Sequence, residues 1–267
     1  MQGEDVSRKW VEEESNSIGG KWREKIPKGW NMFSDHYKIA RDMSQRQYAY
    51  LLSLPIVLHV PSAHTYIVHA GLLPHDPTRD PTHPRQPLSH VPSLSLNITG
   101  NEKDIQRLRV LQEQALLHDI PQNKDPWVKM NIRSVKKNNR VTKHSKIGTP
   151  WSEIWGAAME TCVGFGLEAW GDEYDLMGKK GKKSLPCRPS TVVYGHAASR
   201  GLDIKRWSIG TDTGCVYGRR LSALVLGSSS NLPSSLREAD NFDDDISLQS
   251  LPYGDDGRGR IVSVKCH

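Results

Sequence analysis

The sequence predicts an α/β fold in one main domain. The 267 residues are enough for one large domain or two small ones. Apolar periodicity predicts helices in the first two thirds of the chain and β-rich runs toward its end. Two short β-rich runs, at 56–60 and 66–69, are joined by a Pro-Ser-Ala-His turn and predict a hairpin. The order of helix, hairpin, helices and strands leaves α/β and α+β arrangements open.

Three helices are expected from their caps and spacing. A Ser-x-x-Gln capping box that starts at Ser44 predicts a helix over 44–53. Apolar residues three and four positions apart predict a second helix over 102–118. Pro150 stands before a third predicted helix, over 151–159.

The last third of the chain is predicted to be mostly β. Its strand-like runs are Thr191–Gly195, Ile204–Gly210, Leu221–Leu226 and Ile261–Val264. Frequent prolines over 74–97 predict an ordered excursion or a polyproline-like loop, and the Ser/Asp-rich stretch 228–257 predicts a disordered insertion. The expected organisation is a polar segment at 1–26, a domain at 27–227, the insertion at 228–257 and a closing strand at 258–267.

Composition limits the classes of protein. The net charge is +6, and no run of 18 apolar residues predicts a membrane span. The first 25 residues are charged and lack the apolar core of a signal peptide, so the chain by itself predicts a cytoplasmic location. The four cysteines never form Cys-x-x-Cys, which argues against a zinc ribbon or a dense disulfide framework. We therefore expect separate reduced thiols.

Two histidines follow predicted strands. His69 ends the run 66–69, and His196 comes directly after Thr191–Gly195; small residues follow both. Ligands collect at strand ends in open α/β sheets, and neutral imidazole binds Zn, Fe or Mn ions. Each histidine could instead be a capping residue with no ligand, but the repetition favours a shared metal site.

Two further features are ambiguous from sequence. Asp212 lies in a glycine-rich turn, where it could orient His196 or simply form the turn. The stretch 129–146 holds seven Lys or Arg residues and no acid, so it could meet a polyanion or form a solvated basic face. It lacks interleaved aromatic residues, so neither base stacking nor sequence-specific nucleic-acid binding is expected.

The ordered motifs VHAGLLP, VVYGHA and IGTDTGCVYGRRLSALVL resemble the C-terminal half of calcineurin-like metallophosphoesterases. The similarity is to the phosphoprotein-phosphatase branch, which includes symmetrical diadenosine-tetraphosphate hydrolases and fungal zinc-dependent endopolyphosphatases. It covers about residues 27–226 and 258–266. It implies a two-sheet β-sandwich flanked by helices. It also implies two divalent metal ions (Zn, Mn or Fe) that hold a phosphate and activate a hydroxide.

The resemblance also implies roles for individual residues. His69 and His196 correspond to metal ligands, Asp212 to an acidic residue with a supporting role, and Arg133 to an arginine that binds phosphate. The implied substrate contains phosphate: polyphosphate or a dinucleotide polyphosphate, favoured over phosphoprotein. Relatives that act on polyphosphate imply a vacuolar location, reached through an N-terminal anchor.

The family's N-terminal motifs, G-D-x-H-G, G-D-x-x-x-R-G and G-N-H-E, are absent from the sequence. They carry the other metal ligands and the proton-donating histidine, so no catalytic residue is expected in this chain. The resemblance thus implies a phosphatase that is N-terminally truncated and impaired. The alternative is a non-catalytic remnant, or a module that binds a polyanion or a partner.

Overall fold

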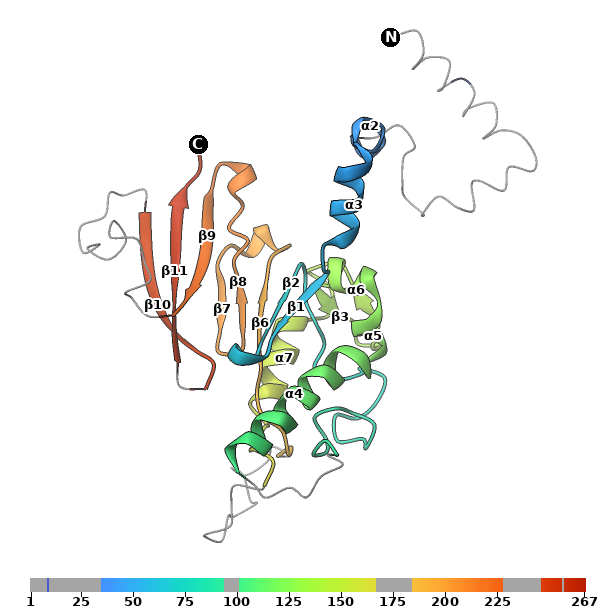
Figure 1. Cartoon of the computed structure of the whole chain (residues 1–267), viewed down its shortest axis with the longest axis vertical. Helices are drawn as coiled ribbons and strands as arrows, with labels where there is room; N and C mark the ends of the chain where they lie inside the picture. The colour runs from blue at the N-terminus through green and yellow to red at the C-terminus, as the bar shows by residue number, and fades with distance from the viewer. Residues whose placement is uncertain (1–8, 10–34, 94–100, 167–183, 228–245, 256) are drawn as a thin grey trace. The chain divides into compact units, whose positions relative to one another are not determined.

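The chain divides into two units, Met1–Pro55 and Ile56–His267 (Figure 1). The computed structural model describes residues 9, 35–93, 101–166, 184–227, 246–255 and 257–267. The expected boundaries of the segment 1–26 therefore lie outside the described residues. All described strands belong to the larger unit.

The described part of the smaller unit consists of two helices, α2 (Asp35–Asp42) and α3 (Gln45–Ser53). The predicted capping box is confirmed: the backbone N–H of Gln47 donates to the Ser44 hydroxyl at 3.3 Å, and the Ser44 N–H donates to the Gln47 side chain at 2.8 Å. The helix ends before the extended Leu54, as expected for a residue that precedes proline.

A mixed five-stranded sheet forms the centre of the larger unit. Its order is β1 (Val57–Val60), β2 (Thr65–Val68), β6 (Thr191–Tyr194), β8 (Ser208–Gly210) and β7 (Asp203–Lys205). The β1–β2 pair is the predicted antiparallel hairpin. Strands β2, β6 and β8 run parallel, and β7 pairs antiparallel with β8. The run predicted as one strand over 204–210 therefore forms two short ones.

A second sheet has the order β10 (Ile246–Tyr253), β11 (Gly257–Lys265) and β9 (Arg220–Leu226), all antiparallel. The prediction of disorder over 228–257 is wrong for β10; residues 228–245 lie outside the described part. Two side chains of β10, Leu251 and Tyr253, are buried. The low apolar content of the whole segment concealed this short alternating run.

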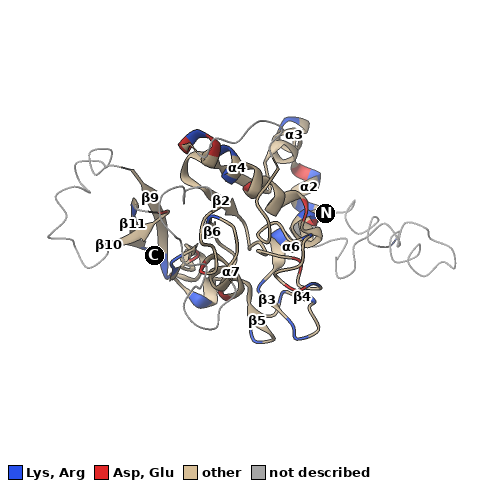
Figure 2. Ribbon diagram, turned by 90° about the horizontal axis from the view of Figure 1, so that it is seen from below, with Lys and Arg blue, Asp and Glu red and all other residues tan. Residues whose placement is uncertain are grey.

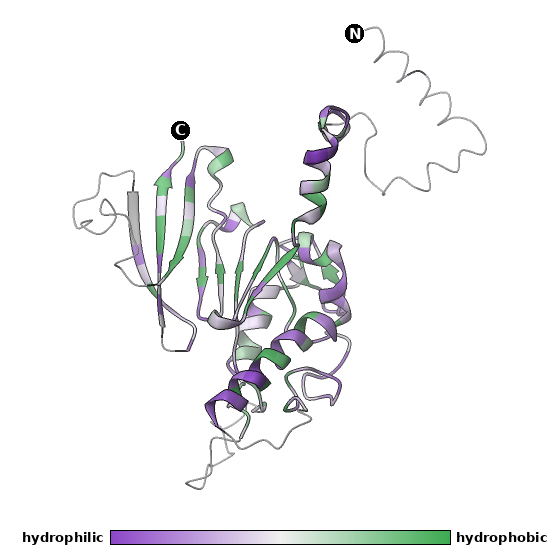
Figure 3. Ribbon diagram, viewed as in Figure 1, coloured by the Kyte–Doolittle hydropathy of each residue, from purple (hydrophilic) through white to green (hydrophobic). Residues whose placement is uncertain are grey.

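The two faces of the five-stranded sheet pack differently. One face meets the helices in a large core that includes Tyr66, Val192 and Trp155. The other meets the second sheet through a smaller core that includes Ile209 and Ile261. Apolar residues follow the strands of both sheets in Figure 3. The larger unit is thus a mixed α/β fold with layers of sheet, sheet and helix.

The remaining elements lie mostly on the helical side of the central sheet. They are α4 (Glu102–His118), α5 (Pro121–Lys124), α6 (Pro126–Asn131), α7 (Trp151–Met159), the small sheet of β3 (Ser134–Val135), β4 (Val141–Thr142) and β5 (Thr149–Pro150), and three 3₁₀ turns, η2 (Pro61–Ala63), η3 (Ala198–Arg200) and η4 (Cys215–Tyr217). The predictions of α4 and α7 are confirmed. The described residues 74–93 of the proline-rich stretch contain neither helix nor strand, as predicted. No described helix has the length and apolar character needed to cross a bilayer.

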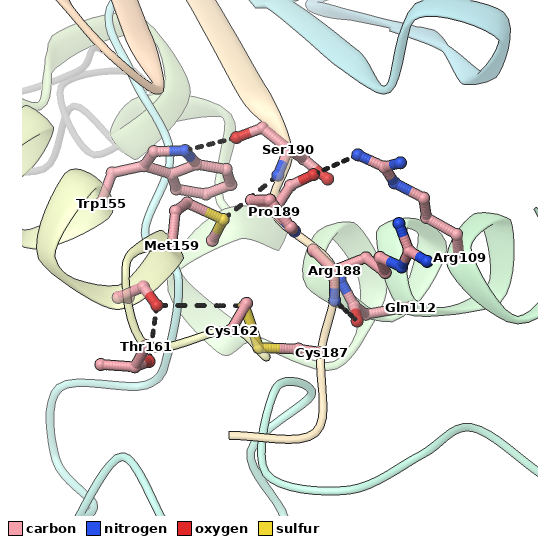
Figure 4. Close-up of a disulfide and its surroundings, with 11 residues drawn as sticks. Arg109, Gln112, Trp155, Met159, Thr161, Cys162, Cys187, Arg188, Pro189 and Ser190 are labelled. Carbon is pink, nitrogen blue, oxygen red and sulfur yellow. Dashed lines mark hydrogen bonds between the residues drawn. A yellow bond between two sulfur atoms is a disulfide. The ribbon is translucent and has the colours of Figure 1, made fainter. Parts of the chain in front are cut away.

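All four cysteines form disulfides, Cys162–Cys187 and Cys215–Cys266, so the expectation of reduced thiols is wrong. Figure 4 shows the first of them beside segment 187–190. There the Trp155 indole N–H donates to the Ser190 carbonyl at 3.0 Å. The bonds join residues 25 and 51 positions apart, and such pairing is set by tertiary structure rather than by a local motif.

Removing the first disulfide should destabilise the protein. Cross-linking a loop of this size restricts the unfolded chain, so the double variant Cys162→Ala/Cys187→Ala should lose about 3 kcal/mol of unfolding free energy in urea denaturation. Protein purified from an oxidising compartment should show no titratable thiol when denatured without reductant. Four thiols under those conditions would contradict both bonds.

Candidate functional site

The carboxyl ends of three parallel strands meet at one edge of the central sheet. The pairing aligns Val68 of β2 with Tyr194 of β6, and Tyr194 with Gly210 of β8. The next residues continue this alignment, because the Gly195 N–H donates to the His69 carbonyl at 2.9 Å. The residues that follow β2, β6 and β8 are therefore neighbours.

His69 and His196 meet at this edge although 127 positions separate them in the chain. His69 Nε2 lies 3.1 Å from His196 Nδ1, and the ring centroids are 4.9 Å apart. At this distance one ring donates a hydrogen bond to the other. The two predicted residues are thus brought together with their nitrogens facing each other.

An unusual backbone conformation fixes the loop after β6, and close packing fixes the loop after β2. His196 has a φ of 60°, in the left-handed region that residues with a Cβ rarely adopt. After His69, the chain turns against α7: a Cβ on Gly71 would lie 2.2 Å from the Trp151 ring. Only glycine allows this approach. The Ala70 N–H also donates to the Lys129 carbonyl at 2.9 Å.

Arg133 lies beside the imidazole pair. Its Nη2 donates to the His196 carbonyl at 3.0 Å, which ties the loop before β3 to the loop after β6. Its buried Nε has no hydrogen-bond partner among the described residues. Arg133, which was also predicted as a site residue, therefore belongs to the same cluster, and its Nε–H donates to no described group.

Asp212 is also close, but its contact is with its own turn. Its Oδ1 accepts the Gly214 N–H at 3.2 Å, as in the turn-forming interpretation of this residue. Within the part of the chain that the structure describes, Asp212 makes no hydrogen bond to the His196 ring. A role for Asp212 in orienting His196 stays a prediction.

The pKa of His196 lies below its usual range. Partial burial is the main cause, and the nearby Arg133 and His69 lower it further, while the charge of Asp212 opposes them. His196 is therefore neutral at neutral pH, and a neutral imidazole keeps the lone pair that a metal ion requires.

The aromatic residues that support the site were not predicted from the sequence. Trp151 meets Tyr194 edge to face at a centroid distance of 4.7 Å, and Tyr194 donates a hydrogen bond to Asp203 at 2.5 Å. Burial and the Asp203 carboxylate raise the pKa of Tyr194 well above its ordinary value. Arg200 extends the cluster, because its Nη2 donates to the Arg133 carbonyl at 3.4 Å. No local motif marks these contacts.

The geometry allows two nitrogen ligands for one metal ion. In a tetrahedral site with metal–nitrogen distances of 2.0–2.1 Å, two ligand nitrogens lie about 3.3 Å apart. The observed 3.1 Å is close to that separation, and a metal ion bound by both nitrogens would take the place of the proton that they share in the hydrogen bond. The described residues hold no group of three or more His, Cys, Asp or Glu side chains suited to a metal.

Comparison with known proteins gives one distant likeness. No family model matches the chain, and no curated protein matches it. A solved structure described provisionally as a diadenosine tetraphosphatase is 22% identical, with a TM-score of 0.35. The match covers 69% of this chain and 52% of the other, so the chain spans about half the length of that protein. Likeness at this level does not bear on function.

The pKa of His196 offers a test of the cluster in solution. Replacing Arg133 by Gln removes a positive charge next to the ring, so in metal-free protein the pKa of His196 should rise. NMR titration of the histidine ring resonances measures it. Arg140→Gln, an exposed change in the β3–β4 turn, should leave it unaltered. A pKa that falls or stays constant in Arg133→Gln would contradict the geometry.

Proposed function

We propose that the chain binds a divalent metal ion through His69 and His196 and takes part in metal-dependent hydrolysis of phosphoester or phosphoanhydride bonds. The observation that carries this proposal is the 3.1 Å approach of two imidazole nitrogens at adjoining strand ends. Parallel strand ends are a preferred place for ligands, and His196 is held neutral. The motif resemblance supplies the class of reaction.

The donor set supports one ion better than two. Two neutral imidazoles give two ligands and no negative charge, whereas a pair of ions requires a bridging carboxylate. No group of described side chains provides that bridge. Further ligands would have to come from water or from outside the described residues. A bound ion would supply Lewis acidity toward a phosphate oxygen or a bound water.

Arg133 is suited to the phosphate. Its guanidinium remains positively charged and lies against the His196 loop, where it can orient an anion next to the imidazoles. Within this proposal, polyphosphate or a dinucleotide polyphosphate is the favoured substrate, because basic residues continue into the 129–146 stretch.

Metal binding is the first test. Isothermal titration with Zn²⁺ or Mn²⁺ should show one saturable site per chain, lost in His69→Ala and in His196→Ala. His144→Ala serves as the control, because His144 is exposed and lies outside the pair. If His69→Ala, His196→Ala and His144→Ala all bind the metal ion equally well, the metal assignment is wrong. It is also wrong if the unaltered chain binds no metal ion.

Hydrolysis is tested separately. With added Mn²⁺ or Zn²⁺, release of phosphate from an aryl phosphate or polyphosphate should fall to background in His196→Ala. Arg133→Gln should mainly raise KM, because it removes a phosphate contact rather than a metal ligand. If the chain binds the metal ion but releases no phosphate in a metal-dependent way, the metal site is supported and the proposed hydrolytic function is wrong.

A second candidate function is polyanion binding by a basic surface. Lys137, Arg140, Lys143 and Lys146 are exposed along β3, β4 and the loop that follows. Figure 2 shows Lys and Arg gathered there. Polyanion binding by this surface requires no metal ion, so this function is compatible with a chain that has no catalytic activity.

Substituting these four residues by Gln should weaken binding to polyphosphate, and binding should fall with added salt. The matched control removes four other exposed charges, Arg46, Arg85, Lys103 and Lys124. Fluorescence anisotropy with labelled polyphosphate measures both. Equal losses in the two variants would show a general charge effect and exclude a specific surface.

A further inference from the structure

A second cluster of ionisable side chains lies at the opposite edge of the central sheet. His64 directly precedes β2, whereas His69 directly follows it. The Glu113 side chain, from α4, is fully buried there. Its two oxygens bind two imidazoles: His59 Nε2 lies 2.6 Å from Oε2, and His64 Nδ1 lies 2.9 Å from Oε1. A buried carboxylate requires such partners.

A buried ion pair completes this cluster. Arg109 is 2% exposed and binds both oxygens of Asp255, at 2.5 and 3.0 Å. Its Nε lies 3.7 Å from Glu113. Burial acts to raise the pKa of Asp255, but the hydrogen bonds and charge of Arg109 hold it below the usual value. Asp255 is therefore ionised and already engaged.

His64 is held in a strained position. Its backbone is left-handed, with φ 49° and ψ 46°. The Thr191 N–H donates to its carbonyl at 2.9 Å, and Glu113 fixes its Nδ1. With Nδ1 engaged, Nε2 is the nitrogen available to a ligand. A carboxylate behind an imidazole is a common way to fix a functional histidine.

His64 lines a cavity of about 580 Å³ between the turn after β1 and the β10–β11 turn. The polar side chains on its walls are Ser62, His64, Tyr253, Asp255 and Arg258. Tyr253 is occupied by a hydrogen bond to Thr65. Asp255 is the one carboxylate among the described lining residues, and Arg109 neutralises it.

One arginine lines this cavity, and two more bind groups of the β10–β11 turn beside it. Arg258 lines it and donates through Nε to the Ser250 hydroxyl at 3.1 Å. Arg206 donates to the carbonyls of Gly254 and Asp255, which belong to the same turn. Among the described residues on and around the cavity, Arg109, Arg206 and Arg258 outnumber the two carboxylates, Glu113 and Asp255. The balance favours an anion over a cation.

We propose that this cavity binds a small phosphate-bearing anion, with the His64 imidazole and the Arg258 guanidinium as its contacts. Phosphate at neutral pH carries both O–H donors and oxygen acceptors, so it can pair with Nε2 in either protonation state of the ring. Arginine matches phosphate oxygens in geometry and charge. Glu113 acts as a positioning residue that holds His64. The site is separate from the His69–His196 pair.

The test follows the His64 ring by NMR in protein with labelled histidine. Titration with inorganic phosphate should shift the His64 Nε2 resonance in a saturable way. Arg258→Gln should raise the Kd at least tenfold, while Arg260→Gln, on the same strand and away from the cavity, should not. Arg133→Gln should leave this binding unchanged, which separates it from phosphate bound at the imidazole pair.

A second titration uses glycerol 3-phosphate to distinguish free phosphate from a phosphorylated small molecule. Tighter binding of glycerol 3-phosphate would assign the site to a phosphorylated metabolite, and tighter binding of inorganic phosphate would assign it to the free ion. A His64 resonance that does not move with either probe would overturn the proposal. So would equal affinity in Arg258→Gln and the unaltered chain. Either result would mean that Glu113, His59 and His64 form a stabilising network without a ligand.

Discussion

The parallel pairing of β2 with β6, and of β6 with β8, is the constraint on which the rest of the structure depends. It sets Val68, Tyr194 and Gly210 side by side and so decides which loops meet. It also gives the sheet two faces, one for the helices and one for the second sheet. A shift of one residue in either pairing would turn every side chain of the shifted strand to the opposite face.

The same pairing separates two chemically different edges of the sheet. At the carboxyl ends, His69, His196 and Arg133 form a cluster without a nearby buried carboxylate partner for either ring among the described residues. At the other edge, Glu113 binds two imidazoles and is fully buried. The imidazoles at the first edge therefore face each other, while those at the second are fixed by a carboxylate. Strand β2, four residues long, connects both.

Local signals in the sequence were enough for the elements that local interactions form. The Ser44 capping box, the spacing in α4 and the proline before α7 each report on neighbouring residues, and these predictions are confirmed. The β1–β2 hairpin is of the same kind. The pairing of β2 with β6 joins residues more than a hundred positions apart, so neither cap nor periodicity could predict it. The meeting of His69 with His196 was expected from their matching places after two predicted strands, and the family motifs supported it.

The failures have a common physical origin in long-range contacts. Arg109 and Glu113 lie on the buried face of α4, beside the apolar residues whose spacing predicted the helix. Their burial depends on partners from distant segments, such as Asp255 and His64. The disulfides were missed for the same reason. Charged residues and cysteines look the same in a sequence whether or not a distant partner reaches them.

The Cys162–Cys187 bond has a consequence for handling the protein. A single protease cut anywhere between these two cysteines would leave both fragments covalently joined, with α7 on one and β6 on the other. The nicked protein would migrate as one species on a non-reducing gel and as two after reduction. Apparent intactness without reductant is therefore no proof of an unbroken backbone, and the central sheet could retain its pairing after such a cut.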